Sequence, residues 1–262
     1  MDELSIMSAT TLSNGRQIPL LGLGVYKSPP GEATERAVLW ALEVYQGYES
    51  TLQACENSLR NLGLEYIDLY ITHSPNPGPK LRKESWDAMQ QLVAKGKVKS
   101  IGKYFGIHNG MVVYRMVELL GSNPTIRPVI NQVEIHPWLT RSDIVSFCEQ
   151  QNIGIEAYSP LTKGRRLSDP TLVRIATKYT KSPAQVLIRW SLQRGFIVLP
   201  KSVTRERIEE NADVFDFDLA EGDMDALNGL NENFVTGECL ERKDAGIPLP
   251  LREPPIASLN WR

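Results

Sequence analysis

The sequence predicts an α/β fold in which helices cover the outside of a parallel sheet. Short apolar runs alternate along the chain with segments of helical periodicity, and the connections between them are short. The length of 262 residues, 42% of them apolar, suits one large domain, and we assign residues 1–262 to a single domain. The alternation alone leaves open whether the sheet is wound open or closed into a barrel.

A hairpin and a first strand–helix unit are predicted to open the chain. Asn14-Gly15, a pair that strongly favours a two-residue hairpin turn, lies between alternating runs in residues 10–18. Residues 20–26 are an apolar run whose glycines permit close backbone approach, which predicts a buried strand. Residues 32–44 carry apolar side chains at helical spacing and predict the first helix.

Five further strands are predicted, with helices between them. The same alternation recurs, and residues 67–72, 99–102, 129–134, 154–158 and 196–199 are predicted to be strands. A helix is expected over 83–94, and another over 142–151 with Ser142 as its cap. Asp169-Pro170 and Ser182-Pro183 each place a capping side chain before a proline at the first helical position.

The alternation of predicted strands and helices is interrupted once, after Val44. Apolar residues from Leu52 to Leu62 recur at spacings of three and four, so a second helix follows the first with only residues 45–49 between them. Two consecutive outer helices remain when a strand–helix–strand piece is missing from a regular repeat. At about 31 residues per unit of a 250-residue barrel, the missing piece would be roughly 45 residues long.

Composition indicates a small-molecule partner. The 29 basic and 31 acidic residues are spread along the chain, so no nucleic-acid or membrane-surface footprint is visible. No signal-peptide run and no apolar run of membrane-spanning length occurs, and we expect a soluble, cytoplasmic protein. Cys55, Cys148 and Cys239 lack metal-ligand spacing, so we expect no metal site and buried reduced thiols on the helix faces.

The end of the last predicted strand has the residues of an anion site. The run over 196–199 stops at Pro200 and gives way to a helical segment. Polar side chains cluster at this transition: Lys201, Ser202, Thr204, Arg205 and Arg207. Amides at a helix start bind anions, and a lysine, hydroxyls and planar arginines add ligands for a phosphate ester. A solvated, capped helix start is the alternative interpretation.

Seven motifs, taken in order, resemble those of the aldo-keto reductases. They are GLGVYK (22–27), GYESTLQACENSLRNLGLEYIDLYITHSP (47–75), GKVKSIG (96–102), INQVEIHPWLTR (130–141), IEAYSPL (155–161), SPAQVLIRWSLQRGF (182–196) and LPKSVTRERIEEN (199–211). The match covers most of residues 8–235 and resembles the short-loop type of fungi and plants. It implies a (β/α)8 TIM barrel with a hairpin closing its bottom, and NADPH-dependent carbonyl reduction at the C-terminal ends of the strands.

The resemblance also assigns the cofactor contacts. The residues that would hold the 2′-phosphate are Lys201, Ser202, Val203, Thr204 and Arg207. The residues that would meet the adenine are Glu210 and Asn211. Tyr158 would stack on the nicotinamide, Ser159 and Leu161 would lie along the pyrophosphate, and Gln132 would contact the carboxamide.

One catalytic residue and one substrate residue are also assigned from the resemblance. His73, at the end of the strand over 67–72, matches the histidine that orients the carbonyl in the family. Trp138 lies in the IHPWLTR loop and is a candidate for the substrate pocket, whereas we assign His136 in the same loop a structural role.

The chain departs from the family at two places. The proton-donating tyrosine of the family, with its supporting aspartate and lysine, lies on the second and third strands, and the predicted gap after Val44 removes strand 2, helix 2 and strand 3. Tyr45 and Tyr48 lack the surroundings of that donor. Lys103 and Tyr104 stand where the family has a Ser-Asn pair for the carboxamide, so we expect a weaker hold on the nicotinamide.

These observations leave three functions open. The first is an NADPH-dependent aldo-keto reductase that is impaired in this shortened form. The second is a non-catalytic NADP(H)-binding or interaction protein, and the third is a barrel that uses His73 as acid or base in another reaction. The partners we expect are a small-molecule carbonyl substrate, no nucleic acid and no membrane, in a monomer or weak dimer.

Overall fold

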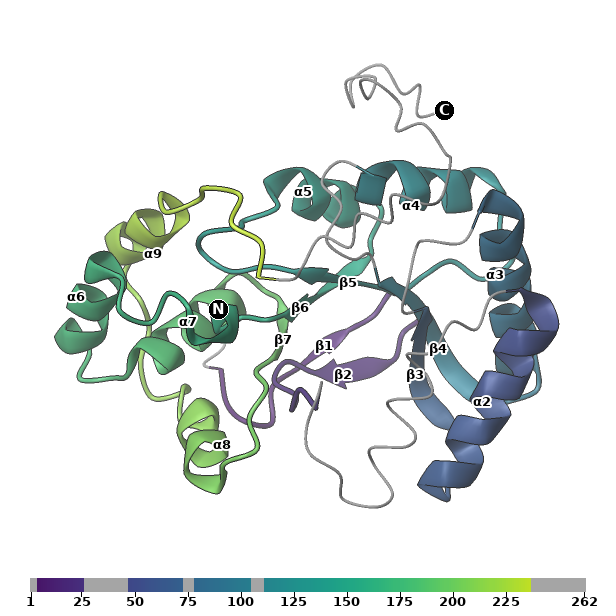
Figure 1. The fold of residues 1–262 in the computed structure, drawn as a ribbon, viewed down its shortest axis with the longest axis horizontal. Helices are drawn as coiled ribbons and strands as arrows, with labels where there is room; N and C mark the ends of the chain where they lie inside the picture. Colours follow the sequence, from purple (N-terminus) through teal and green to yellow (C-terminus); the bar gives the residue numbers. More distant parts are fainter. Residues whose placement is uncertain (1–3, 26–46, 73–77, 105–110, 237–262) are drawn as a thin grey trace.

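The computed structural model of the chain describes residues 4–25, 47–72, 78–104 and 111–236, and Figure 1 shows their arrangement. In these ranges five parallel strands form one curled sheet in the order β3-β4-β5-β6-β7. The strands are β3 (Ile67–Thr72), β4 (Val98–Tyr104), β5 (Ile130–Glu134), β6 (Gly154–Tyr158) and β7 (Ile197–Leu199). All five lie where the apolar runs predicted them.

Helices surround the outside of this sheet, from α2 and α3 at one end to α6, α7, α8 and α9 at the other (Figure 1). They are α2 (Tyr48–Leu62), α3 (Pro79–Ala94), α4 (Met111–Gly121), α5 (Ser142–Gln150), α6 (Pro170–Lys178), α7 (Pro183–Gln193), α8 (Arg205–Ala212) and α9 (Glu221–Asn228), with a short 3-10 turn η1 (Thr162–Gly164) after β6. The helix predicted over 32–44 lies outside the described residues.

The predicted hairpin is present at the N-terminal end of the sheet. Strands β1 (Ala9–Thr11) and β2 (Gln17–Pro19) pair antiparallel around Gly15, which has a φ of +80°. The Asn14 Nδ2 donates to Ser100 Oγ at 2.9 Å, so the turn of the hairpin lies against β4. Leu12 packs with Ile130 of β5, which places the hairpin beneath the sheet.

The strand predicted over 20–26 is present only as two parallel bridges beside β7, formed by Leu21 with Val198 and by Gly24 with Lys201. The glycines permit the close approach, because a Cβ on Gly24 would lie 3.0 Å from the Leu199 carbonyl oxygen. On the other side of the sheet, β3 pairs with β4 alone among the described strands. The sheet is therefore that of an incomplete α/β barrel, which confirms the predicted fold class.

Helix starts follow the sequence signals in two cases and depart from them in two. Asp169 accepts from the Thr171 and Leu172 amides, and Ser182 forms a capping box with Gln185, as predicted. Ser142 is not a cap, because the Val145 amide donates to the carbonyl of Arg141, the left-handed residue before it. Helix α3 begins four residues before the predicted Lys83, with Pro79 in its first turn.

The buried apolar residues form two clusters. The larger one joins the sheet to helices and contains Trp86, Met89, Ile101 and Trp190, among others. The smaller one joins Leu12 of the hairpin to residues of β5, β7 and α7. Cys55 and Cys148 are fully buried, and burial raises the pKa of each thiol to about 11, which confirms the expectation for these two cysteines. No helix in the described ranges is long and apolar enough to cross a membrane.

Candidate functional site

The carboxyl ends of β4 to β7 bring most of the predicted site residues to one edge of the sheet. Backbone register pairs Tyr104 with Gln132, Glu134 with Tyr158, and Tyr158 with Leu199. Gln132, Tyr158 and the loop after Leu199 therefore follow one another along neighbouring strand ends. In parallel α/β sheets this edge is where ligands bind.

Two tyrosines meet at the end of β4 and β6. The Tyr104 hydroxyl donates to the Tyr158 hydroxyl at 3.2 Å, and their ring centroids lie 5.3 Å apart. Burial, and then the neighbouring Tyr104, raises the pKa of Tyr158 far above its usual value. Tyr158 therefore keeps its proton, so it can offer a hydrogen bond or a ring face but is a poor proton source. The predicted nicotinamide residue thus has a polar neighbour in Tyr104, one of the two residues at which the chain departs from the family.

Gln132 is engaged by a buried carboxyl group on the adjacent strand. Its Nε2 donates to Glu156 Oε2 at 2.5 Å. Burial raises the pKa of Glu156 despite this hydrogen bond, because the carboxyl group is removed from water. The Gln132 amide group is thereby held in one orientation along the sheet edge.

The chain turns sharply after β6, where Ser159 and Leu161 were assigned to the pyrophosphate. Ser159 adopts a φ of +52°, in the left-handed region, and its carbonyl accepts from the Thr162 amide at 2.9 Å. Leu161 is partly buried and packs against both core clusters. The turn brings the chain over the edge of the sheet and into η1.

The loop between β7 and α8 presents its cations to solvent. Lys201 and Arg207 are exposed, and neither has an acidic partner among the described residues, whereas Arg205 Nε donates to Glu209 at 2.8 Å. Ser202 Oγ accepts from the Thr204 amide at 3.2 Å, and no side chain caps the first turn of α8. The helix start is therefore solvated, as in the alternative interpretation, but lacks a side-chain cap, so its amides and two cations are available to an anion.

The remaining residues predicted to contact the cofactor lie on the same segment. Val203, assigned to the 2′-phosphate, is 54% exposed, which leaves it able to contact a ligand. Glu210 is partly buried, and Asn211 is buried in the last turn of α8. The segment therefore carries its cations near the start of α8 and Glu210 and Asn211 near the end of that helix.

The loop after β5 is buried beneath residues close to the end of α9. Trp138 is only 2% exposed, and its carbonyl accepts from the Phe234 amide at 3.0 Å. Its assignment to the substrate pocket stays a prediction. His136 is fully buried, and its Nε2 lies 3.4 Å from Glu134 Oε1, consistent with the structural role expected of it.

Glu134, the last residue of β5, accepts hydrogen bonds from Thr236. Its Oε1 accepts from the Thr236 amide at 2.8 Å and also from the Thr236 hydroxyl. Burial acts to raise the pKa of Glu134, but the hydrogen bonds from His136 and Thr236 outweigh it and hold that pKa below its usual range. The buried carboxylate is therefore charged and fixes the chain where it crosses the sheet edge.

Lys103, beside Tyr104, faces the opposite way. Alternation along β4 places it with Ile101 on the helix side, where its Nζ lies 5.8 Å from the Trp86 ring centroid. Burial, and then the nearby Arg82, lowers the pKa of Lys103 to about 8. It cannot replace the polar carboxamide contact of the family, because it is on the wrong face of the strand.

The predicted catalytic His73 lies outside the described residues, as do His108 and Cys239. Sequence reasoning missed the pairing of Tyr104 with Tyr158 and of Gln132 with Glu156. Period-two alternation along the predicted strands was the available signal, since it places each residue on the inner face of the sheet. No group of three or more His, Cys, Asp or Glu residues in the described ranges could hold a metal ion.

The curled parallel sheet, its outer helices and its polar strand ends define an α/β-barrel protein. The chain belongs to the aldo/keto reductase family, whose sequence model matches residues 42–232. This establishes the family predicted from the motifs, and with it the class of oxidoreductases.

Three known proteins illustrate the likeness. The uncharacterized oxidoreductase YtbE of Bacillus subtilis is 46% identical over 192 residues, which are 73% of this chain and 65% of that protein. Glyoxal reductase of the same bacterium is 36% identical over 273 residues, covering 89% of this chain and 96% of that enzyme. The crystal structure of a Gox0644 variant in complex with NADPH has a TM-score of 0.74 at 35% identity, covering 86% and 93% of the two chains.

The lengths of these alignments bear on the missing segment. The chain matches less than two thirds of YtbE, and the alignment with glyoxal reductase is longer than the 262 residues of this chain. That enzyme therefore contains residues that have no counterpart here. The placement of the gap after Val44 stays a prediction.

Proposed function

We propose that this chain binds NADP(H) through the loop between β7 and α8, and that it reduces small aldehydes or ketones weakly in this shortened form. The observation that carries the proposal is the pair of exposed cations, Lys201 and Arg207, beside a helix start without a side-chain cap. Two positive groups and free amides suit the doubly charged phosphate on the adenosine ribose of NADPH, which NADH lacks. The family membership and the NADPH complex of Gox0644 support it.

The site residues form two groups, one for each end of the cofactor. Arg207 and Lys201 neutralise the 2′-phosphate, and the Ser202 and Thr204 hydroxyls add neutral donors. Val203 lies between these two hydroxyl residues, and Glu210 and Asn211 contact the adenine. Ser159 and Leu161 guide the pyrophosphate across the turn after β6.

At the other end, Gln132 and Tyr158 receive the nicotinamide. NADPH supplies a hydride when bound, and His73 orients the carbonyl of the substrate, with Trp138 on the substrate side. A reduced carbonyl oxygen needs a proton, and positioned acids typically contribute about 10²–10⁴-fold to such a step. The raised pKa of Tyr158 makes it a poor substitute for the donor on the missing strands. Slow turnover in the short form follows from that loss.

The exposed cations of the loop between β7 and α8 also favour a second candidate function, a non-catalytic NADP(H)-binding protein. The exposed cations and the helix start without a side-chain cap would serve cofactor binding alone, and Tyr158, whose pKa burial raises far above its usual value, is a poor proton donor. Both functions require the phosphate site, so they differ only in turnover.

Fluorescence quenching tests the phosphate site. We expect NADPH to bind more tightly than NADH, and Arg207→Ala to weaken NADPH about tenfold or more, since hydrogen bonds to charged groups contribute about 1.5–3 kcal/mol. Arg205→Ala is the matched control, because Arg205 is paired with Glu209 on the same helix. Equal affinity for both nucleotides, or equal losses in the two variants, contradicts the assignment.

A turnover assay separates the two candidate functions. NADPH oxidation with a reactive aromatic aldehyde is compared between this chain and one that carries a family-like insert after Val44. Weak activity that the insert restores supports the impaired reductase. Tight NADPH binding without any turnover in either chain supports the non-catalytic function.

A further inference from the structure

Tyr104 and Tyr158 lie on the same face of the sheet as Gln132. Backbone register pairs Tyr104 with Gln132 and Gln132 with Glu156, and residues paired in parallel strands point to the same face. Tyr158, two residues after Glu156, faces the same side because side chains alternate along a strand. Lys103, the residue before Tyr104, faces the helices, so the face that the two tyrosines share is the inner one.

The side chains of Tyr104 and Tyr158 meet across β5. Tyr104 ends β4 and Tyr158 ends β6, and β5 lies between these two strands in the sheet. Their hydroxyl oxygens are 3.2 Å apart and their ring centroids 5.3 Å apart, with the ring planes tilted by 41°. The tyrosine pair therefore extends over the inner face of the strand that carries Gln132.

Both side chains that were assigned to the nicotinamide already have a partner within the protein. The Tyr158 hydroxyl accepts from Tyr104, and Gln132 Nε2 donates to Glu156 Oε2 at 2.5 Å. The Tyr104 ring is flat and six-membered, like that of nicotinamide, and its distance from the Tyr158 ring is within the roughly 4.5–7 Å of aromatic pairs. A nicotinamide that stacks on Tyr158 therefore has to compete with Tyr104.

The phosphate end of the proposed site differs in this respect. Lys201 and Arg207 are exposed, and no side chain caps the first turn of α8. In the described part of the chain, an anion can therefore bind at this helix start without displacing a capping side chain. One end of the site is open to its ligand, whereas the other end is occupied by contacts between the protein's own side chains.

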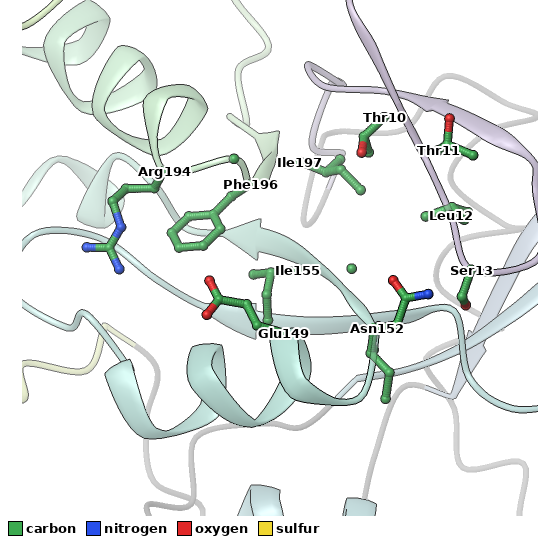
Figure 2. A pocket seen from close by; sticks show the side chains of 13 residues that line it. Thr10, Thr11, Leu12, Ser13, Glu149, Asn152, Ile155, Arg194, Phe196 and Ile197 are labelled. Atoms are coloured by element: carbon green, nitrogen blue, oxygen red, sulfur yellow. The ribbon is translucent and has the colours of Figure 1, made fainter. Parts of the chain in front are cut away.

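The pocket in Figure 2 does not give the nicotinamide another place. It is lined by hairpin residues 10–13, by the C-terminal end of α5 and by the first residues of β6 and β7. Tyr158 is the last residue of β6, so this pocket lies at the opposite end of the strands. The competition for the nicotinamide position is therefore decided at the tyrosine pair.

We propose that Tyr104 occupies the position of the nicotinamide ring, so that the chain recognises NADP(H) through its 2′-phosphoadenosine half. This inference rests on the phosphate site of the proposed function. The nicotinamide reaches Tyr158 only while Tyr104 is turned away, and a site that is open for part of the time binds more weakly by that fraction. The nicotinamide consequently adds no affinity, and NADPH, NADP⁺ and 2′-phospho-ADP-ribose, which has no nicotinamide, bind equally.

Isothermal titration of the full chain with these three nucleotides and with NADH tests the proposal. We expect three equal Kd values for the unaltered chain, and weaker binding of NADH, which lacks the 2′-phosphate. Tyr104→Ser removes the competing ring, so it should tighten NADPH binding about three- to tenfold, the contribution of one aromatic contact, and leave 2′-phospho-ADP-ribose unchanged. Tyr114→Ser is the matched control, because Tyr114 is 54% exposed on α4, and it should change neither affinity.

The outcomes separate the role of Tyr104 from the phosphate site. Tighter binding of NADPH than of 2′-phospho-ADP-ribose by the unaltered chain overturns the role of Tyr104 and leaves the phosphate site in place. Unchanged NADPH affinity in folded Tyr104→Ser does the same. Equal binding of NADH and NADPH, or binding of none of the four nucleotides, overturns the phosphate site and this proposal with it. The comparison of nucleotides on the unaltered chain needs no substitution, so it decides the question even where Tyr104→Ser fails to fold.

Discussion

Replacing Lys103 by methionine should stabilise the protein at neutral pH. Lys103 is 4% exposed, and burial together with Arg82 lowers its pKa from 10.5 to about 8. Each pKa unit corresponds to about 1.4 kcal/mol, so keeping this lysine charged in the folded state costs roughly 3 kcal/mol. Methionine has a similar length and no charge, and it would lie against Trp86 as an apolar side chain.

The pH dependence follows from the direction of the pKa shift. Below about pH 8 the lysine is charged in both the folded and the unfolded chain, and the full cost is present. Between about 8 and 10.5 the folded chain has released the proton while the unfolded chain still binds it, so the stability of the unaltered protein rises. The advantage of Lys103→Met should therefore be largest at neutral pH and vanish above 10.5.

Urea denaturation at neutral pH and above the unfolded pKa measures this difference. Lys99→Met is the matched control, because Lys99 lies on the same face of β4 and is only half-buried, with its Nζ 4.6 Å from the Tyr66 ring centroid. We expect a gain of up to about 3 kcal/mol for Lys103→Met and little change for Lys99→Met. A loss of stability in Lys103→Met, or a gain that persists in alkali, would refute the electrostatic argument.

Two further predictions concern the edges of the fold. Thr236→Val removes a hydroxyl donor from Glu134 and should cost about 1.5–3 kcal/mol of unfolding free energy at neutral pH. Because folding lowers the pKa of Glu134, this loss should shrink in acid as the carboxylate is protonated. Denaturation curves that shift equally in acid and at neutral pH would contradict this. In hydrogen exchange followed by mass spectrometry, amides of residues 20–66 should exchange faster than those of 129–200. Among the described residues, Leu21 and Gly24 join the sheet only through isolated bridges beside β7, whereas β5 and β6 have strand partners on both sides. Equally slow exchange would mean that the barrel closes in another way.

Local signals in the sequence were enough for most of the strands and for two helix starts. Short strand-like segments between helical ones mark a parallel α/β sheet, so the strands from Ile67 and Ile130 could be located without any tertiary information. Asp169 and Ser182 cap their helices through neighbours two or three residues away, which a sequence displays directly. By contrast, the start of α5 is set by the left-handed Arg141, whose conformation depends on the loop around it.

The cluster of cations after β7 could be recognised in the sequence, whereas the contacts between neighbouring strands could not. The cations of 201–207 lie close together in sequence, whereas Gln132 and Glu156 meet only because β5 and β6 pair in one particular register. The link between Glu134 and Thr236 joins residues far apart in the chain. Such contacts depend on strand order and helix packing, which hydrophobic periodicity does not specify.

The bridges between residues 20–24 and β7 also constrain how the chain can fold during synthesis. The Gly22 amide donates to the Val198 carbonyl, and the Val198 amide donates back to the Leu20 carbonyl, so residues made early are bonded to residues made much later. A ribosome adds about 5–20 residues each second, so the apolar segment around Leu21 waits many seconds for its partner. During that interval the hairpin and this segment remain available to chaperones or to another nascent chain. Closing such a long loop late in folding is slow, and the yield of folded protein should therefore depend on synthesis rate more than on the stability of the finished sheet.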